Sequence, residues 1–209
     1  MSERPPDARS RREWLRHIAV SLGMGAAANC TLAAQDAHRV HQAVAADKAA
    51  ANGPYVPKAL TPHEFATLQR LSDLIVPADE HSPGALAAGA AEFIDFLCSA
   101  SDEMKRIYTG GLAWMDEAIR RRGDGESFLS AAPDRQAALL DAIAWRESAA
   151  AGMEPGVEFF EWARKMVADA FYTSPIGIRD LGYEGNRAMA EFHVPQEAVD
   201  YAIKRSPFA

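Results

Sequence analysis

The sequence predicts an all-α fold, a compact bundle of five or six helices with long loops. Three observations support this prediction. Apolar residues recur every three or four positions in five segments after residue 60, which is the spacing of one helix face. Capping residues, prolines and glycines stand at the boundaries of these segments. No stretch shows the strict alternation of apolar and polar residues that is typical of a half-buried strand.

The first helix of the bundle is expected to begin at Thr61. Thr61 is a good N-cap, Pro62 suits the first turn, and Glu64 lies three residues after the cap, which completes a capping box. An apolar stripe at helical spacing follows between residues 65 and 75. Pro77 then ends the helix, since proline cannot continue the backbone hydrogen bonding.

The loop after this helix contains the pair Pro83-Gly84. Glycine after proline is typical of a type II turn, which needs a positive φ at the glycine. We therefore expect Gly84 to have a structural role that a residue with a Cβ cannot fill. Further helices are predicted after this loop, in segments 85–100, 101–123, 132–148 and 154–175, with a short one near 197–205.

The N-terminal 34 residues have the three parts of a secretory signal peptide. The charged part carries Arg11 and Arg12 in the motif SRREWL, which is similar to the twin-arginine consensus. A weakly apolar stretch at 18–28 and small residues suited to cleavage follow. This pattern predicts twin-arginine export to the periplasm, a route used by proteins that fold before they cross the membrane. The alternative is an amphipathic N-terminal helix with a chance arginine pair.

Residues 35–60 are predicted to be a linker that precedes the domain at 61–209. The linker is rich in alanine and polar residues, and a glycine and two prolines interrupt its C-terminal end. It has room for a short helix around residues 40–50. His38 and His41 can share a face of that helix, but two histidines alone make a poor metal site, so both are expected in solvent.

The charge balance of the chain is acidic. The whole sequence has 22 basic and 29 acidic residues and a net charge of −7. Removing the 5 basic and 3 acidic residues of the leader leaves 17 basic and 26 acidic residues, a net charge of −9. Such a balance argues against a nucleic-acid-binding protein, which needs a basic face. After the leader, no stretch approaches the roughly 18 to 20 apolar residues that span a bilayer.

The sequence contains no motif for a catalytic, cofactor-binding or metal site. It lacks a glycine-rich dinucleotide motif, a haem-attachment motif, a cysteine set for zinc and a nucleophile elbow. The acids and histidine at 79–81 are expected to form a solvated turn, and Asp73 to face solvent or cap a neighbouring loop. An independent periplasmic ligand-binding domain or enzyme would have to use Asp73, Asp95 and His193.

Cysteine and exposed aromatic side chains are the candidates for contact with a partner. Cys30 lies in or near the leader, so the exported chain keeps Cys98. Cys98 is expected either to be buried as a small apolar residue or to pair with a cysteine of another chain. Trp114, Trp145 and Tyr172 are aromatics of the kind that protein interfaces favour at their centres.

Two blocks of the sequence carry a recognisable pattern. The first lies between the end of the first predicted helix and the next helix, and the second lies near the C-terminus. Their residues are Asp73, Ile75, Val76, Pro77, Pro83, Gly84, Ala85, Gly89, Phe93, Ile94 and Asp95, then Phe171, Ser174, Pro175, Gly182, Tyr183, Gly185 and Asn186. In this order and spacing they resemble the gluconate 2-dehydrogenase subunit 3 family. That family usually has Gly-Gly-Asn where this chain has Glu184 in the first glycine's place.

The resemblance implies a non-catalytic small subunit. Such subunits resemble partners of a large flavin-dependent dehydrogenase of the glucose-methanol-choline type, which acts on a sugar, a polyol or a glycoside, as glucoside 3-dehydrogenase does. The FAD belongs to the large subunit, and haem c to a cytochrome that accepts the electrons. The resemblance further implies that the large subunit has no leader and is exported in complex with the small one. It covers roughly residues 60–195.

Overall fold

The computed structural model describes residues 31–51, 53–182 and 194–206, with the backbone alone at 31–35. These ranges contain helices and no strand, which confirms the predicted all-α fold. Among these residues, no helix is both long enough and apolar enough to cross a membrane. The helices are α2 (Thr31–Ala51), α3 (Pro62–Ile75), α4 (Gly84–Ala88), α5 (Ala90–Ala100), α6 (Asp102–Arg122), α7 (Pro133–Ile143), α8 (Glu154–Tyr172), α9 (Pro175–Asp180) and α10 (Gln196–Arg205).

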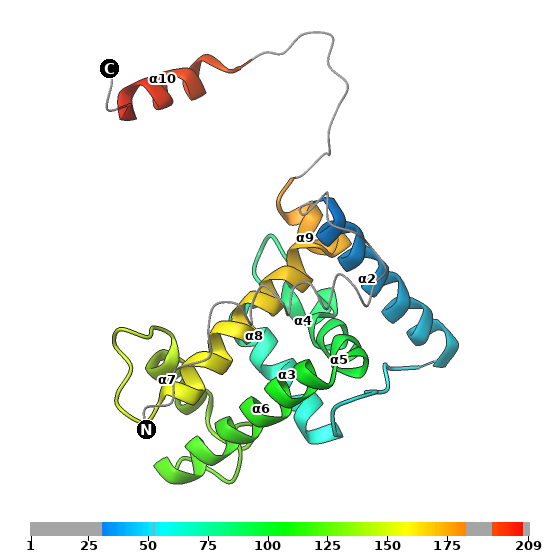
Figure 1. The fold of residues 1–209 in the computed structure, drawn as a ribbon, viewed down its shortest axis with the longest axis vertical. Helices are drawn as coiled ribbons and strands as arrows, with labels where there is room; N and C mark the ends of the chain where they lie inside the picture. The colour runs from blue at the N-terminus through cyan, green and yellow to red at the C-terminus, as the bar shows by residue number, and fades with distance from the viewer. Residues whose placement is uncertain (1–30, 52, 183–193, 207–209) are drawn as a thin grey trace, which may run out of the picture.

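Helix α8 is the central element of the bundle. It crosses the molecule diagonally from α7 to α9 (Figure 1). It packs against α3, α4, α5, α6, α7 and α9. Its buried side chains, which include Val157, Phe159, Ala163 and Val167, recur at helical spacing and supply one wall of the core.

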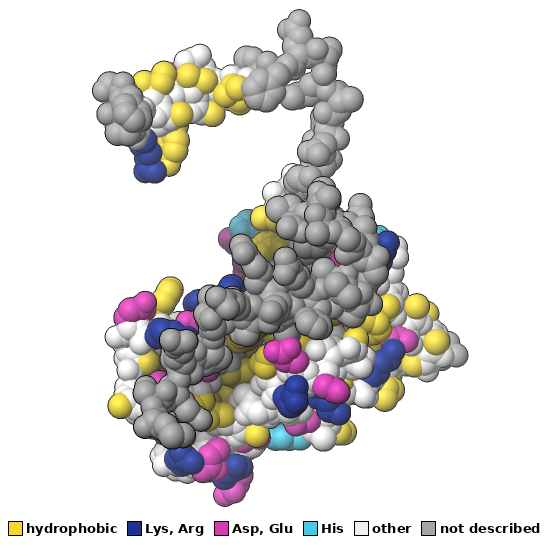
Figure 2. Space-filling view, in the orientation of Figure 1, with side chains coloured by type: hydrophobic (Ala, Val, Ile, Leu, Met, Phe, Trp, Pro, Cys, Tyr) yellow, Lys and Arg dark blue, Asp and Glu magenta, His cyan; other side chains and the backbone are white. Residues whose placement is uncertain are grey.

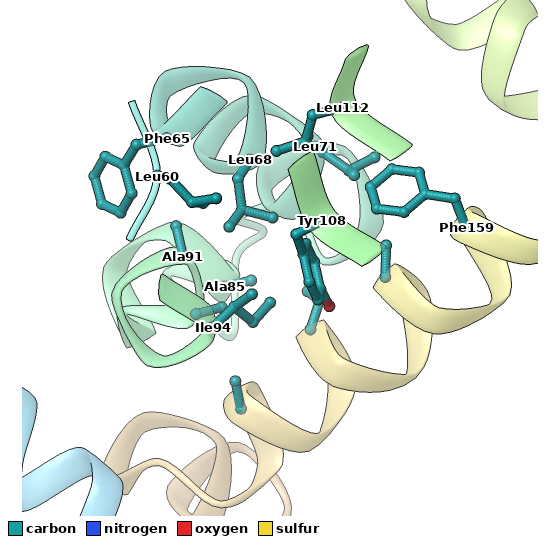
Figure 3. Close-up of a cluster of buried hydrophobic side chains, with 14 of the residues drawn as sticks. Leu60, Phe65, Leu68, Leu71, Ala85, Ala91, Ile94, Tyr108, Leu112 and Phe159 are labelled. Atoms are coloured by element: carbon teal, nitrogen blue, oxygen red, sulfur yellow. The ribbon is translucent and has the colours of Figure 1, made fainter. Parts of the chain in front are cut away.

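The core lies where α3, α5, α6 and α8 meet. Figure 3 shows Leu68 and Leu71 of α3, Ile94 of α5 and Tyr108 of α6 turned toward one another, with Phe159 of α8 at the edge of the group. All five side chains are almost completely buried. The apolar stripes predicted from the sequence therefore meet in one hydrophobic core.

Two glycines allow α6 and α8 to approach each other closely. A Cβ on Gly111 of α6 would collide with the Phe159 ring, and a Cβ on Gly156 of α8 would collide with the Trp114 ring. Each helix thus places an aromatic ring over a glycine of the other helix. Tyr108 also meets Phe159 edge-on, with ring centroids 5.8 Å apart.

The predicted helix boundaries are largely confirmed at α3 and α6. The capping box is present, since Thr61 Oγ1 accepts from Glu64 N at 3.3 Å and the Glu64 carboxylate accepts from Thr61 N at 2.8 Å. The Ser101 side chain caps α6 by accepting from the backbone N–H of Met104. Gly123 ends α6 in the left-handed conformation.

The structure has more helices than the expected five or six because short helices were missed. The segment 85–100 was expected to be a single helix, but Gly89 has a φ of 77° and separates α4 from α5. The sequence predicts Pro175 only as the end of the helix over 154–175. Pro175 is also the first residue of α9, which Ser174 caps by accepting from the N–H of Gly177 at 3.0 Å.

The predicted linker at 35–60 differs most from the structure. Helix α2 occupies residues 31–51, packs on α5, and buries Ala37, Val40 and Val44. The expected short helix at 40–50 is therefore part of a much longer one. Alanine-rich sequence has high helix propensity, and its three buried residues recur at positions i, i+3 and i+7.

Candidate interaction surface

The carboxylate of Asp95 anchors the segment before α3 to α5. Asp95 is fully buried. Its Oδ1 accepts from the backbone N–H groups of Ala59 at 3.1 Å and Leu60 at 2.9 Å. Its Oδ2 accepts from the N–H of Lys58 at 2.7 Å and the hydroxyl of Tyr55 at 2.9 Å. Four donors compensate the lost hydration of the carboxylate, so Asp95 is a structural anchor with both oxygens engaged.

Helix α2 is fastened to the bundle by two further contacts. His41 Nε2 lies 3.1 Å from Thr173 Oγ1 at the end of α8, and Lys48 donates to Glu92 of α5 at 2.7 Å. The expectation that His41 lies in solvent is wrong: the ring is part-buried, and this burial lowers its pKa. His38 is exposed, as expected.

Asp73 takes part in a chain of polar contacts at the surface of α3. Arg70 Nη1 donates to Asp73 Oδ2 at 2.8 Å, and Arg70 Nε donates to Gln136 Oε1 at 2.8 Å. Gln136 in turn donates to the carbonyl of Phe128 at 2.7 Å. Asp73 therefore orients an arginine that joins α3 to α7. Asp73 and Asp95 lie on different helices, and each has structural partners of its own.

The turn between α3 and α4 requires glycine at position 84. Gly84 has a φ of +74°, and a Cβ there would lie 2.8 Å from the carbonyl carbon of Pro77. The backbone N–H of Ala85 donates to the carbonyl of Val76 at 2.9 Å and closes the turn. The structural role predicted for Gly84 is confirmed. The type II geometry is not, because Pro83 has a ψ of 6° instead of about 120°.

Of the four residues proposed to contact a partner, one is buried in the core and another is partly buried against it. Cys98 is a buried free cysteine, and burial raises its pKa to about 12. Cys98 is therefore buried as a small apolar residue, and a disulfide to another chain through it is wrong for this fold. Trp114 packs over Gly156 between α6 and α8, so it too serves the core.

Trp145 is exposed in the connection between α7 and α8. Its side chain is 62% exposed, and the guanidinium of Arg164 on α8 lies 5.3 Å from the ring centre. The neighbouring Arg146 forms an ion pair with Glu161 of α8 at 2.9 Å. The connection is thus held on α8 by two arginine contacts, which present the indole to solvent.

A second exposed apolar group lies where α8 meets α9, and we call it the α8–α9 corner. It consists of Tyr172, Ile178 and Leu181, which are 44%, 37% and 61% exposed. Ile178 lies on α9, and Leu181, the C-cap residue of this helix, follows three positions later on the same side. Sequence reasoning identified Tyr172 but missed Ile178 and Leu181, since α9 itself was not predicted. Large exposed side chains grouped in this way are typical of interaction sites.

The surface in Figure 2 is otherwise a mixture of charged and apolar side chains.

Within the described ranges, no three His, Cys, Asp or Glu side chains are grouped so that they could hold a metal ion. The acids and histidine at 79–81 form the expected turn, in which Asp79 Oδ1 accepts from the N–H groups of His81 and Ser82 at 2.8 Å.

Comparison with protein families matches residues 62–189 to the family described as gluconate 2-dehydrogenase subunit 3. The match covers more than half of the chain. This chain belongs to the gluconate 2-dehydrogenase subunit 3 family. Comparisons with curated proteins and with solved structures gave no match. The name of the family implies that its members are subunits of a dehydrogenase complex.

In this member of the subunit 3 family, the first sequence block has a clear structural meaning. Pro77, Gly84 and Ala85 build the turn that joins α3 to α4, and Asp95 anchors the preceding segment. Helices α2 and α10 lie outside the matched residues 62–189. Of the other predicted residues, Arg11, Arg12, Gly185, Asn186 and His193 lie outside those that the structure describes.

Proposed function

We propose that this chain is the non-catalytic small subunit of a periplasmic, flavin-dependent sugar or glycoside dehydrogenase. In this proposal it escorts the large subunit through twin-arginine export and stabilises it afterwards. The family match over the helical domain is the observation that supports the proposal. The arginine pair at Arg11 and Arg12 supports the export route.

The proposal assigns the chemistry to other chains. A large subunit of the glucose-methanol-choline type would bind FAD and take the hydride from the sugar, and a cytochrome with haem c would accept the electrons. FAD is loaded in the cytoplasm. A subunit that has bound FAD must cross the membrane folded, which is why a partner with a twin-arginine leader would be needed.

Two groups of exposed side chains are candidates for the contact with the large subunit. Trp145 lies beside the first half of α8, and the α8–α9 corner lies at its C-terminal end. A helix of 19 residues is about 28 Å long, so a partner that covers both groups would bury the length of α8. An interface of that extent suits a stable complex of about 1,600 Å² or more.

The central test is purification of the tagged chain from its native host. We expect flavin absorbance and sugar-dependent reduction of an artificial electron acceptor to co-purify with the tag. Leu181→Asp should reduce the amount of flavoprotein recovered at least tenfold, because a carboxylate would then have to be buried in the contact. Val56→Asp is the matched control, since Val56 is 69% exposed on the segment before α3. A wild-type preparation without flavin would reject the proposed function.

The export route has a test of its own. Replacing Arg11 and Arg12 by lysine should leave both this chain and the flavoprotein in the cytoplasm. Periplasmic fractions of the variant strain are compared with those of the wild type and of a strain without the twin-arginine machinery. Normal accumulation in the strain without that machinery would show that the arginine pair does not direct export.

No observation favours the alternative of an independent enzyme or ligand-binding domain. Both oxygens of Asp95 are engaged by structural donors, and Asp73 forms an ion pair with Arg70. His193, the third residue of that alternative, lies outside the described residues. Turnover by the isolated, flavin-free chain would revive it.

A further inference from the structure

Helix α10 is the most clearly amphipathic element outside the bundle. At 100° per residue, its polar and charged side chains Gln196, Glu197, Asp200 and Lys204 fall within a narrow arc. The broad opposite arc holds Ala198, Val199, Tyr201, Ala202 and Ile203, and the last residue of the helix, Arg205, also falls there beside Tyr201. Two contacts form within α10. Gln196 donates to Asp200 at 2.8 Å, and the guanidinium of Arg205 lies 4.5 Å from the centre of the Tyr201 ring.

The apolar arc of α10 has no cover in the part of the chain that the structure describes. None of its ten residues is buried, and Tyr201 and Ile203 are 60% and 55% exposed. Figure 1 shows α10 standing apart from the bundle, and Figure 2 shows hydrophobic side chains open along it. A helix of this length is marginal in water unless an apolar face packs against something. The apolar face of α10 is therefore expected to pack against another surface.

The charges of α10 argue against a membrane as that surface. A helix that lies on an anionic membrane is rich in Lys and Arg on its polar face. On the polar side of α10, Lys204 instead lies beside Glu197 and Asp200, and the helix as a whole balances these two acids against Lys204 and Arg205. The chain as a whole has a net charge of −7, so its overall charge adds no attraction to an anionic membrane.

The size of α10 argues against pairing with a second copy. The helix is about 15 Å long, so two such faces would bury much less than the roughly 1,200 Å² of the smallest stable interfaces. The apolar face of α10 is large enough, however, to serve as a second contact with a partner that is already bound to the bundle. The first contact then supplies a high effective concentration for the second. The chain between Gly182 and Val194 can extend to at most about 40 Å, which permits contact at a separate place on that partner.

We propose that α10 is a docking arm whose apolar face binds an apolar groove on the large dehydrogenase subunit. The inference rests on the proposed function, because the partner is the subunit that the bundle contacts. Helix-in-groove binding uses anchors at positions i, i+3, i+4 and i+7 of one face. In α10, Val199, Ala202 and Ile203 occupy positions i, i+3 and i+4 of such a face. Docking would stabilise the short helix at the same time.

Hydrogen exchange tests the arm directly. The amides of residues 196–205 are followed by mass spectrometry in the isolated full chain and in the flavoprotein complex purified from the native host. We expect fast exchange in the isolated chain and at least tenfold slower exchange in the complex. Protection already present in the isolated chain would assign the cover to this chain or to a second copy. Protection gained on vesicles of phosphatidylglycerol and phosphatidylethanolamine would assign it to a membrane. Either result would overturn the proposal.

A pair of variants then tests which face is used. The double variant Val199→Gln with Ile203→Gln should raise the dissociation constant of the complex at least tenfold, as measured by mass photometry on dilution. The control Lys204→Gln introduces the same residue next to Ile203 on the polar face and should leave the constant unchanged. If the wild-type complex is intact but α10 stays unprotected, the docking arm is rejected and the proposed function stands. The same holds if both variants have equal effects on the dissociation constant. A wild-type chain that binds no flavoprotein rejects the proposed function and the arm with it.

Discussion

At the scale of single residues, two buried tyrosines show how the same hydroxyl can have opposite effects on stability. Tyr55 donates to the Asp95 carboxylate, and burial together with this hydrogen bond holds the pKa of Tyr55 well above its usual value. Tyr108 is completely buried, and its hydroxyl has no hydrogen-bond partner among the described residues. A buried hydroxyl without a hydrogen-bond partner lowers the free energy of unfolding, whereas one with a partner raises it.

Removing these two hydroxyls therefore gives a matched prediction. Tyr55→Phe should lower the free energy of unfolding by about 1 kcal/mol, because Asp95 loses one of its four donors. Tyr108→Phe should leave it unchanged or raise it by up to about 1 kcal/mol. Chemical denaturation of both variants measures the difference. A larger loss in Tyr108→Phe than in Tyr55→Phe would mean that the Tyr108 hydroxyl has a partner after all.

At the scale of elements, the turn between α3 and α4 combines two constraints on one glycine. Gly84 has a positive φ and its Cα lies against backbone atoms of Pro77 and Ala78, where a Cβ would come within 2.8 Å and 2.6 Å. Gly123, at the end of α6, has a similar φ of +71° but nothing within 4 Å of a Cβ. The pair separates the cost of backbone conformation from the cost of close approach.

Alanine at each of these glycines should therefore have different effects. Gly123→Ala should cost about 1 kcal/mol, the conformational cost alone. Gly84→Ala should cost about 3 kcal/mol or more, because the backbone of the preceding turn must also move. Thermal unfolding of the two variants provides the comparison. Equal costs would show that the turn yields without strain.

At the scale of the whole molecule, the attachment of α2 should depend on pH through His41. Burial lowers the pKa of His41 in the folded chain below its unfolded value of about 6.5. The unfolded chain therefore binds more protons as the pH falls below that value, and the contribution of His41 to stability is lost there. Above pH 6.5 the contribution is fully present.

Denaturation midpoints at pH 7.5 and pH 5.5 test this dependence. The wild type should lose more stability between these values than His41→Gln, which has no titrating group in the contact with Thr173. His38→Gln is the control, since His38 is exposed on the same helix. An identical pH dependence in the wild type and in His41→Gln would exclude His41 as the cause.

The fold class could be predicted from the sequence because the apolar stripes of α3, α6 and α8 are long and their ends carry capping residues such as Thr61 and Gly123. Helix α9 was missed because it is shorter than two turns and shows no periodicity, and α4 was merged with α5 because no local pattern shows that Gly89 has a positive φ. The interaction surface was predicted only in part. Whether Cys98 and Trp114 face inward depends on how α5, α6 and α8 pack, which no local pattern determines.

The contact between His41 and Thr173 joins residues 132 positions apart. During synthesis, α2 leaves the ribosome long before the end of α8 exists. At 5 to 20 residues per second, the delay is roughly 7 to 26 s. Throughout that time the docking site of α2 lacks Thr173, although the contacts of α2 with α5 can already form. The arrival of Thr173 completes this site, so the His41 contact forms only in a chain whose bundle has been synthesised almost to its end. In the export route proposed above, a twin-arginine leader that is recognised only after this contact has formed would restrict export to chains with a finished domain.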